Sequence, residues 1–330
     1  MKLSQKGEFG LIELIRKKCG WPGKKVILGI GDDAAVIKSD PNKLLVLTTD
    51  ALIQTVHFNL DYFSFYQLGW RSLAANLSDL AAMGGRPVCC LVTLGLNDGV
   101  SVENLMQFYQ GVLALSKRFD CPVVGGDIVR SPRQIVISIS ALGEVEKTKV
   151  AKRSGARAGD LICVTGELGE AQAGLELLLK KRKNKSLQFS PALTRKHLLP
   201  LPRLAESDFL VHNTKLNSLI DISDGLASDL HQICKESKVG AVIYERKIPL
   251  GSKAVQAARL LKKNPLEFAL YGGEEYELLF TLTKSQAQRL LCKARFKLTV
   301  IGEILPRKEG VSLEKAGQKS KLLPQGYTHF

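Results

Sequence analysis

The segment NSLIDISDGLASDL, residues 217–230, places an apolar strand directly before a helix. Its first half has the short apolar run of a buried β-strand, and residues 225–237 have the spacing of an amphipathic helix. Three acids, Asp221, Asp224 and Asp229, surround the junction, although the chain as a whole has a formal net charge of +15. The segment therefore predicts one unit of an α/β fold whose strand ends in acidic side chains.

The same alternation of strand and helix patterns continues along most of the chain. Strands are expected at residues 44–50, 88–96, 122–127, 134–145, 161–165, 218–222, 241–244 and 277–282, and helices at residues 8–19, 64–83, 101–119, 169–180 and 225–237. Ser101 is the expected N-cap of its helix, and a loop is expected around Pro191, Pro200 and Pro202. The alternation predicts an α/β (α+β) fold with mixed sheets.

A polar stretch, EKTKVAKRSGARAGD (146–160), interrupts this alternation. It is the best candidate for a domain junction, because it is rich in charged residues and glycine and lacks an apolar pattern. We therefore expect an N-terminal domain at residues 1–148 and a C-terminal domain at residues 149–330.

The composition is that of a globular protein with a basic surface. Hydrophobic residues make up 45% of the chain, and 47 Lys and Arg residues stand against 32 acids. A nucleic-acid-binding protein would usually cluster this excess and interleave aromatic residues, which are only 6% here. The one dense basic run, KKRKNK (180–185), is interpreted as a solvated helix end and loop, with a functional polybasic patch as the alternative.

The seven cysteines and the apolar runs indicate the compartment. The cysteines contain no C-x-x-C pair, which argues against a disulfide framework and against a zinc site. The N-terminal stretch has no small-residue cleavage site, and the longest apolar runs have the length of strands. We expect a cytoplasmic protein with reduced thiols, no targeting segment and no membrane partner.

Acids follow apolar runs at several further places. Any single Asp could cap a helix or form a turn, as Asp224 could before Gly225. Several buried carboxylates, however, repel one another and lose hydration unless cations neutralise them. Oxygen ligands without His or Cys favour Mg²⁺, which also binds substrate phosphates. The further places are Asp32 and Asp33; Thr48, Thr49 and Asp50; Asn76 and Asp79; and Asp127 after Gly125 and Gly126, whose backbone would allow close approach of a ligand.

The familiar nucleotide and metal motifs are missing. The chain contains no G-x-x-x-x-G-K-[ST], no H-R-D catalytic loop with D-F-G, and no H-E-x-x-H. A metal-dependent phosphate enzyme with this sequence must therefore use another scaffold.

Nine stretches occur in one order, with conventional spacing, from about residue 7 to the end of the chain. They are EFGLIELI, GIGDDAAV, TTDALIQTVHF, NLSDLAAMGG, VVGGDIV, RSGARAGDLICVTGELGEAQAGLELL, DISDGLASDL, YGGEEYELLFT and GYTHF. Together they resemble the thiamine-monophosphate kinase family, which belongs to the superfamily of aminoimidazole ribonucleotide synthetase and selenophosphate synthetase. The resemblance implies transfer of the γ-phosphoryl group of ATP to thiamine monophosphate, which yields thiamine diphosphate and ADP with the help of several Mg²⁺ ions.

The resemblance also implies an architecture and a set of site residues. The fold would be α/β in two halves, with the N-terminal halves paired across a homodimer and the C-terminal half closing over the site. Metal ligands would be Asp33, Thr48, Thr49, Asp50, Asp79, Asp127, Asp221 and Asp224, with one of the two threonines acting through its backbone. ATP contacts would come from Tyr109, Gly126, Asp127, Arg153 and Ser223. Thiamine monophosphate contacts would come from His57, Glu274 and Tyr327.

Each of these assignments has an ordinary structural alternative. His57 could be a satisfied core histidine, Tyr109 could belong to the core beside Phe108, and Arg153 could be a surface charge. Tyr327 lies near the end of the chain, where disorder is common. The residues around Glu274 could form a turn leading into a strand.

The chain departs from the family pattern at two places. Glu275 stands where the family usually has Asp, which keeps the charge but lengthens its reach by one methylene. Gln54 and Thr55 stand where the family often has Glu-Gly, so a position suited to glycine carries a β-branched side chain.

The substrate explains why no general base or covalent nucleophile is expected. A monophosphate has a second pKa near ~6, so it is largely a dianion at neutral pH and is already a nucleophile. The obstacle is repulsion between two polyanions, which is overcome by positioning and charge neutralisation. We therefore expect direct in-line transfer without a phosphoenzyme.

Two other functions remain open from the sequence. One is a related superfamily enzyme that uses ATP to make a phosphorylated acyl or selenide intermediate. Cys19 before GWPGKK has the position of a reactive thiol of such an enzyme, but it follows a basic helix end and is interpreted as structural. The other is a basic RNA-binding protein without catalysis, against which the acids at the strand ends argue, because carboxylates repel a phosphate backbone.

Overall fold

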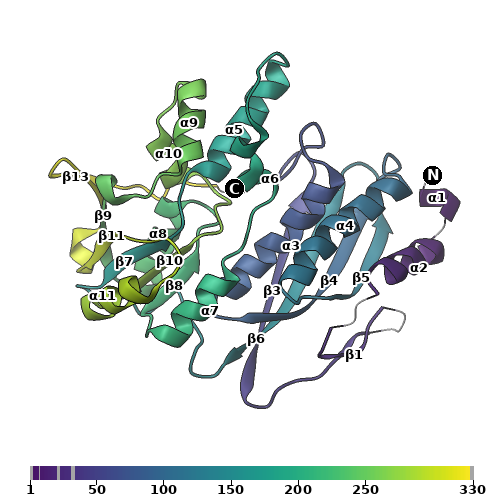
Figure 1. Cartoon of the computed structure of the whole chain (residues 1–330), viewed down its shortest axis with the longest axis horizontal. Helices are drawn as coiled ribbons and strands as arrows, with labels where there is room; N and C mark the ends of the chain where they lie inside the picture. The colour runs from purple at the N-terminus through teal and green to yellow at the C-terminus, as the bar shows by residue number, and fades with distance from the viewer. Residues whose placement is uncertain (1–2, 7, 21–22, 31–33, 328–330) are drawn as a thin grey trace. The chain divides into compact units, whose positions relative to one another are not determined.

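The structure is a computed structural model that describes residues 3–6, 8–20, 23–30 and 34–327 (Figure 1). The chain divides into two compact units, of which the first comprises Met1–Leu80 and Gly85–Lys147 and the second Ala81–Gly84 and Thr148–Phe330. Each unit has its own sheet. The two are described separately below.

The first unit is built on a four-stranded mixed sheet. Its strands lie in the order β3-β6-β4-β5, with β4 and β5 parallel and the other pairs antiparallel. The described elements are α1 (Leu3–Lys6), α2 (Glu8–Lys18), β1 (Val26–Leu28), β2 (Val36–Ile37), β3 (Lys43–Ile53), α3 (Phe65–Ala82), β4 (Arg86–Leu96), α4 (Val102–Arg118), β5 (Val123–Arg130) and β6 (Val136–Glu146).

Helices α3 and α4 lie side by side on one face of this sheet (Figure 1). They approach closely at Gly69 and Gly111, where an added Cβ would come within 1.9 Å and 1.8 Å of the backbone oxygens of the other helix. The other face of the sheet is open: Leu45 and Leu47 of β3 are 59% and 75% exposed. A strand's alternating side chains therefore point either to the two helices or to this open face.

The second unit has a seven-stranded sheet in the order β13-β12-β9-β11-β7-β10-β8, whose only parallel pair in the described chain is β12 with β9. Buried aliphatic residues of β7, β8, β10 and α8 form its core, among them Ile162, Ile220, Leu226, Leu230 and Leu279. Its strands are β7 (Leu161–Thr165), β8 (Ser218–Asp221), β9 (Gly240–Tyr244), β10 (Leu278–Leu282), β11 (Leu298–Leu305), β12 (Val311–Lys315) and β13 (Gln318–Lys321), and its α-helices are α5 (Glu170–Lys183), α6 (Arg195–Leu198), α7 (Leu204–Asn213), α8 (Leu226–Ser237), α9 (Ser252–Leu261), α10 (Pro265–Tyr271) and α11 (Lys284–Lys293).

The expected strands and helices are confirmed with small shifts of their ends, as is the N-cap at Ser101, whose hydroxyl accepts a hydrogen bond from the N–H of Asn104. The loop expected around Pro191, Pro200 and Pro202 was wrong in one respect, because this stretch also contains α6 and a 3₁₀ helix, Pro191–Leu193, and leads into α7. Proline fits the first turn of a helix, where its missing N–H has no intrahelical partner, and Pro191 occupies such a position after the N-cap Ser190. Within the described ranges no helix has the length and hydrophobicity needed to span a membrane.

Candidate active site

A half-buried pair of carboxylates, Asp50 and Asp79, lies between strand β3 and helix α3 in the first unit. The hydroxyl Oγ1 of Thr48 donates a hydrogen bond to Oδ2 of Asp79 at 2.5 Å. Burial raises the pKa of Asp50 to about 6, and the negative charge of Asp79 adds to the rise. The structure therefore brings together three of the predicted ligands, Thr48, Asp50 and Asp79, on the helix side of the sheet.

The side chain of Thr49 lies on the opposite face of the sheet, as strand alternation requires. Its hydroxyl donates to the backbone oxygen of Ile139 at 3.2 Å and accepts from Ser140 Oγ at 3.0 Å. Any part of Thr49 in a site with Thr48 and Asp50 would thus be played by its backbone rather than its hydroxyl.

Three other predicted residues line a hollow of about 1020 Å³ in the first unit. These are Tyr109 on α4 and Gly126 and Asp127 on β5, and the lining also includes Ile12 and Ile15 of α2. Tyr109 is also a core residue, because it is 2% exposed and packs edge-on against Phe108 with ring centroids 5.6 Å apart. The hollow is large enough for a nucleotide.

The fold itself requires a glycine at position 126. Its φ of +153° is rarely adopted by other residues, and an added Cβ would lie 1.9 Å from the backbone oxygen of Val92 on β4. The glycine is therefore required by the neighbouring strand, independently of any ligand that enters the hollow.

The first-unit residues form two groups rather than one cluster. Asp50 lies on β3 and Asp127 on β5, which are the two edges of the four-stranded sheet. Three interstrand spacings separate these edges, roughly 14 Å. Asp33, the remaining predicted ligand of this unit, lies outside the described residues.

Three acids gather where β8 ends and α8 begins in the second unit. Asp221 and Asp229 are buried, and the Oδ2 atom of Asp229 accepts hydrogen bonds from the N–H groups of Asp224 and Gly225 at 3.2 Å and 3.1 Å. Burial raises the pKa of Asp229 to about 8, with further contributions from Asp221 and Asp224. Because the N-cap of α8 is Gly225, Asp224 is not its capping residue.

The segment Gly272–Glu277 lies against the end of β8. The N–H of Glu274 donates to Ser223 O at 2.7 Å, and the N–H of Tyr327 donates to Asp224 O at 3.1 Å. The structure thus brings together Ser223, Asp224, Glu274 and Tyr327, which the sequence assigned to three different ligands. Tyr327 is held at this place by its backbone although it lies close to the C-terminus.

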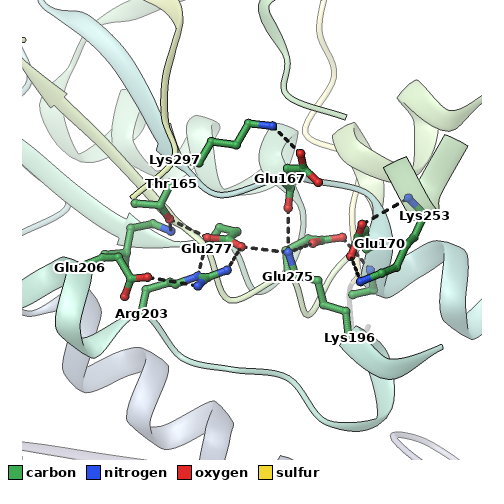
Figure 2. Close-up of polar contacts among 12 residues, drawn as sticks. Thr165, Glu167, Glu170, Lys196, Arg203, Glu206, Lys253, Glu275, Glu277 and Lys297 are labelled. Atoms are coloured by element: carbon green, nitrogen blue, oxygen red, sulfur yellow. Dashed lines mark hydrogen bonds and ion pairs between the residues drawn. The ribbon is translucent and has the colours of Figure 1, made fainter. Parts of the chain in front are cut away.

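A buried ion cluster lies behind this segment (Figure 2). Glu277 accepts hydrogen bonds from Arg203 Nε and Nη2 at 2.7 Å and 2.6 Å, from Lys196 Nζ at 2.9 Å and from Thr165 Oγ1 at 2.7 Å. Glu275 accepts from Ala171 N at 2.9 Å and pairs with Lys196 Nζ at 2.8 Å. Both glutamates are completely buried.

The sequence does not mark Lys196, His197 or Arg203 as site residues, because they lie in the proline-containing stretch expected to form a loop. Their acidic partners are more easily recognised, because Glu275 and Glu277 alternate with apolar residues at the start of a buried strand. A buried carboxylate needs a cation, but nothing in the local sequence shows which of the many basic residues supplies it.

The remaining predicted residues have local roles. Nδ1 of His57 accepts a hydrogen bond from the N–H of Ile53 at 3.0 Å, as a satisfied turn histidine would. Arg153 is exposed, and its backbone oxygen accepts from Ser237 Oγ at 3.3 Å.

The donors fit a hard divalent cation better than a soft one. All side chains of the two acidic groups offer oxygen, and their burial makes the ionised forms costly unless a cation is present. In the part of the chain that the structure describes, no three His, Cys, Asp or Glu side chains are arranged to hold a metal by themselves. A metal here would need further oxygen ligands such as phosphates, as Mg²⁺ commonly does.

Comparisons with known proteins give one consistent result. The description "AIR synthase related protein, N-terminal domain" matches residues 31–145, and "AIR synthase related protein, C-terminal domain" matches residues 157–314. Thiamine-monophosphate kinase from Aquifex aeolicus is 39% identical over 100% of both chains. The crystal structure of thiamine-monophosphate kinase from Stenotrophomonas maltophilia K279a has a TM-score of 0.82 at 34% identity and covers 97% of this chain and 99% of that one.

A further solved structure, "AaThiL complexed with AMPPCP and TMP", has a TM-score of 0.77 at 38% identity and covers 100% of this chain and 99% of that one. These similarities extend over both units and both groups of acids. The chain belongs to the thiamine-monophosphate kinase family, within the AIR synthase related proteins.

Proposed function

We propose that this protein phosphorylates thiamine monophosphate with ATP and releases thiamine diphosphate and ADP. The observation that carries the proposal is the identity of 38% with a structure complexed with AMPPCP and TMP, over 100% of this chain. AMPPCP is an analogue of ATP, so that complex combines a nucleotide triphosphate with TMP. The acids of both units would supply oxygen ligands for the cations that a transfer between two phosphates requires.

We assign the metal site to Asp33, Thr48, Thr49, Asp50, Asp79, Asp127, Asp221 and Asp224. The half-buried pair formed by Asp50 and Asp79 supports this, because two partly desolvated carboxylates of like charge favour a divalent cation between them. Mg²⁺ bound there would neutralise phosphate charge and hold β- and γ-phosphate oxygens in place.

The residues of this chain would act by binding and orienting. We assign the ATP contacts to Tyr109, Gly126, Asp127, Arg153 and Ser223, of which the first three line the hollow of the first unit. His57, Glu274 and Tyr327 would bind thiamine monophosphate. The position of Glu274 beside Ser223 and Asp224 supports a role next to the reacting phosphates.

No side chain is assigned as a general base or covalent nucleophile. The accepting monophosphate is already a dianion at neutral pH, so attack on the γ-phosphorus requires alignment and not proton removal. We expect in-line transfer without a phosphoenzyme. Protein that remains unlabelled after incubation with γ-³²P-ATP alone would support this, and a label chased by thiamine monophosphate would contradict it.

We also propose that the first unit, assigned to residues 1–148, binds ATP and pairs with a second copy, while residues 149–330 close the site. The open sheet face with Leu45 and Leu47 supports the pairing, since exposed apolar side chains on a sheet favour coverage by another surface. A cytoplasmic location is supported by the seven cysteines, all of which are free thiols. Light scattering would test the homodimer.

The decisive experiment follows the conversion of thiamine monophosphate by chromatography, with ADP release measured in the same samples. We expect one thiamine diphosphate per ADP, and we expect EDTA to abolish both and excess Mg²⁺ to restore them. Formylglycinamidine ribonucleotide in place of thiamine monophosphate tests the related superfamily activity. Turnover with that substrate alone would overturn the proposal.

A further inference from the structure

Lys196 lies at the centre of the buried ion cluster, apart from the residues assigned to metal, ATP or thiamine monophosphate (Figure 2). Its ammonium group lies 2.8 Å from Glu275 Oε2, 2.9 Å from Glu277 Oε1 and 2.7 Å from the backbone oxygen of Glu167. The ammonium donates hydrogen bonds to Glu167 O and Glu277 Oε1, and its contact with Glu275 Oε2 is an ion pair. Lys196 therefore joins three places in the chain at a single atom.

The two fully buried carboxylates, Glu275 and Glu277, face two cations, Lys196 and Arg203. Arg203 also pairs with the partly exposed Glu206 at 3.1 Å. Burial disfavours the ionised form of Glu277, but Lys196 and Arg203 outweigh it and hold the pKa of Glu277 below its ordinary value. Burial raises the pKa of Glu275, and Lys196 opposes that rise. Lys196 is the cation that both carboxylates share.

The two glutamates flank a backbone segment that needs support. Glu274 has φ of 64° and Tyr276 has φ of 51°, in the left-handed region that non-glycine residues rarely adopt. Such residues persist where the surrounding structure holds them. Glu275 lies between them and Glu277 follows directly, so the anchored side chains alternate with the strained backbone positions.

This segment in turn holds the chain between the two proposed metal ligands of the second unit. The N–H of Tyr276 donates to Ile222 O at 2.9 Å, and the N–H of Ile222 donates to Glu277 O at 2.7 Å. Ile222 lies directly after Asp221 and two residues before Asp224. Lys196 is thus linked to the chain between Asp221 and Asp224 in two steps. It forms ion pairs with Glu275 and Glu277, and the backbone of their segment forms hydrogen bonds with Ile222.

The adjacent residue supports the same segment from α6. Nδ1 of His197 lies 3.2 Å from Oε2 of Glu274, and its side chain is buried. Lys196 and His197, on one short helix, therefore contact all three acids of the segment: Glu274, Glu275 and Glu277.

We propose that Lys196 is a positioning residue, which sets the geometry of Asp221, Ser223 and Asp224 by anchoring Glu275 and Glu277. It does not touch the reactants. This inference rests on the proposed function, because it concerns the efficiency of that reaction.

The test compares Lys196→Met with the double variant Lys196→Met/Glu275→Gln. The single variant leaves two buried carboxylates, Glu275 and Glu277, with one cation, Arg203. The double variant leaves only Glu277 with that cation. We expect Lys196→Met to lower both the melting temperature and kcat/KM for thiamine monophosphate, the latter by about 10–100-fold, as supporting partners of metal ligands commonly do. The double variant should recover much of the melting temperature but not kcat/KM.

Hydrogen exchange separates positioning from general stability. In the double variant we expect faster exchange in peptides that cover residues 222–224 and 272–278, with unchanged exchange in the strands β9 and β11. The matched control is Lys253→Met, since Lys253 is a lysine of the same unit that is 44% exposed and pairs with Glu170 at 3.5 Å. It should match the wild type in both assays.

Two results would overturn the proposal: wild-type kcat/KM in Lys196→Met, or recovery of kcat/KM together with the melting temperature in the double variant. If neither variant folds, Glu275→Gln, which leaves Lys196 paired with Glu277, is tested against the same outcomes. Wild-type activity is measured alongside, so an inactive wild type refutes the proposed function, while the exchange pattern still decides whether Lys196 holds the segment.

Discussion

The hydroxyl of Thr48 donates a hydrogen bond of 2.5 Å to the carboxylate of Asp79, which joins strand β3 to helix α3 across 31 positions of sequence. This contact orients Asp79 toward the strand that also carries Asp50. Two half-buried carboxylates held close together destabilise the fold and favour the binding of a metal ion. A site of this kind should be less stable than its neutral variants and far more active.

The substitution Asp50→Asn tests whether this carboxylate lowers the stability of the fold and supports its activity. Burial and Asp79 raise the pKa of Asp50 to about 6, so the carboxylate, which is largely ionised at pH 7, lowers the stability of the folded protein relative to the unfolded chain. We expect the melting temperature to stay the same or rise, and kcat/KM to fall on the order of 100-fold or more. Calorimetry and the chromatographic assay measure the two quantities.

The matched control is Asp98→Asn, because Asp98 is 81% exposed and pairs with Arg130 on the surface. It should leave both quantities unchanged. An Asp50→Asn enzyme with wild-type turnover would remove Asp50 from the proposed site.

Asp221 and Asp229 should differ in kind although both are buried acids of the second unit. The carboxylate of Asp229 accepts hydrogen bonds from the N–H groups of Asp224 and Gly225, a role that the amide oxygen of Asn can also fill. We expect Asp229→Asn to keep activity within about 10-fold and Asp221→Asn to lose on the order of 100-fold. Titration of activity with Mg²⁺ should show a higher requirement for the Asp221 variant. Equal losses in the two variants would contradict the assignment.

Thr55→Gly should stabilise the protein. Thr55 has φ of 71°, a conformation that is strained for a β-branched residue and free of strain for glycine. Relief of the strain exceeds the entropic cost of glycine and the loss of the 3.0 Å hydrogen bond from Gln134. We expect the free energy of unfolding to rise by about 1 kcal/mol, measured by urea denaturation.

Thr214→Gly serves as the comparison, since Thr214 has φ of −149° and gains nothing from glycine. It should be less stable than the wild type. A Thr55→Gly protein that is destabilised to the same extent would mean that the turn is not strained.

Glu277→Gln should change stability in a pH-dependent way. Lys196 and Arg203 overcome the effect of burial and hold the pKa of Glu277 below its ordinary value of 4.5, so the ionised form stabilises the fold. That contribution is complete above the unfolded pKa and is lost as the pH falls through the folded pKa. We expect the variant to be less stable by about 3–5 kcal/mol at pH 7, because it leaves buried cations uncompensated.

The difference between wild type and variant should shrink below pH 4.5, which is the unfolded value. Denaturation at several pH values checks this. Glu13→Gln, which removes one partner of an exposed pair with Lys17, should show almost no difference at any pH. A constant difference for Glu277→Gln from pH 7 to pH 3 would show that its charge does not contribute.

Local patterns predicted much of the fold because its elements obey local rules. The helix with N-cap Ser101 is an example: Ser101 and Asn104 form reciprocal hydrogen bonds that depend only on residues three apart. The acids Asp50, Asp127 and Asp221 could likewise be recognised from their own segments. The expectation that each acid ends its strand is confirmed for Asp221 but was wrong for Asp50 and Asp127, because β3 and β5 each continue three residues further. The missed helix α7 follows two prolines, which suit both a loop and the approach to a helix.

The sequence by itself determined the alternation of strands and helices, the family and the positions of the acids, since each is encoded in short segments or in their order. Only the tertiary structure decided which polar and charged groups meet: Thr48 and Asp50 with Asp79, and Glu275 and Glu277 with Lys196 and Arg203. The physical reason is that packing over long sequence distances selects the partners of a buried charge, because many lysines and arginines are chemically equivalent and few are placed within reach.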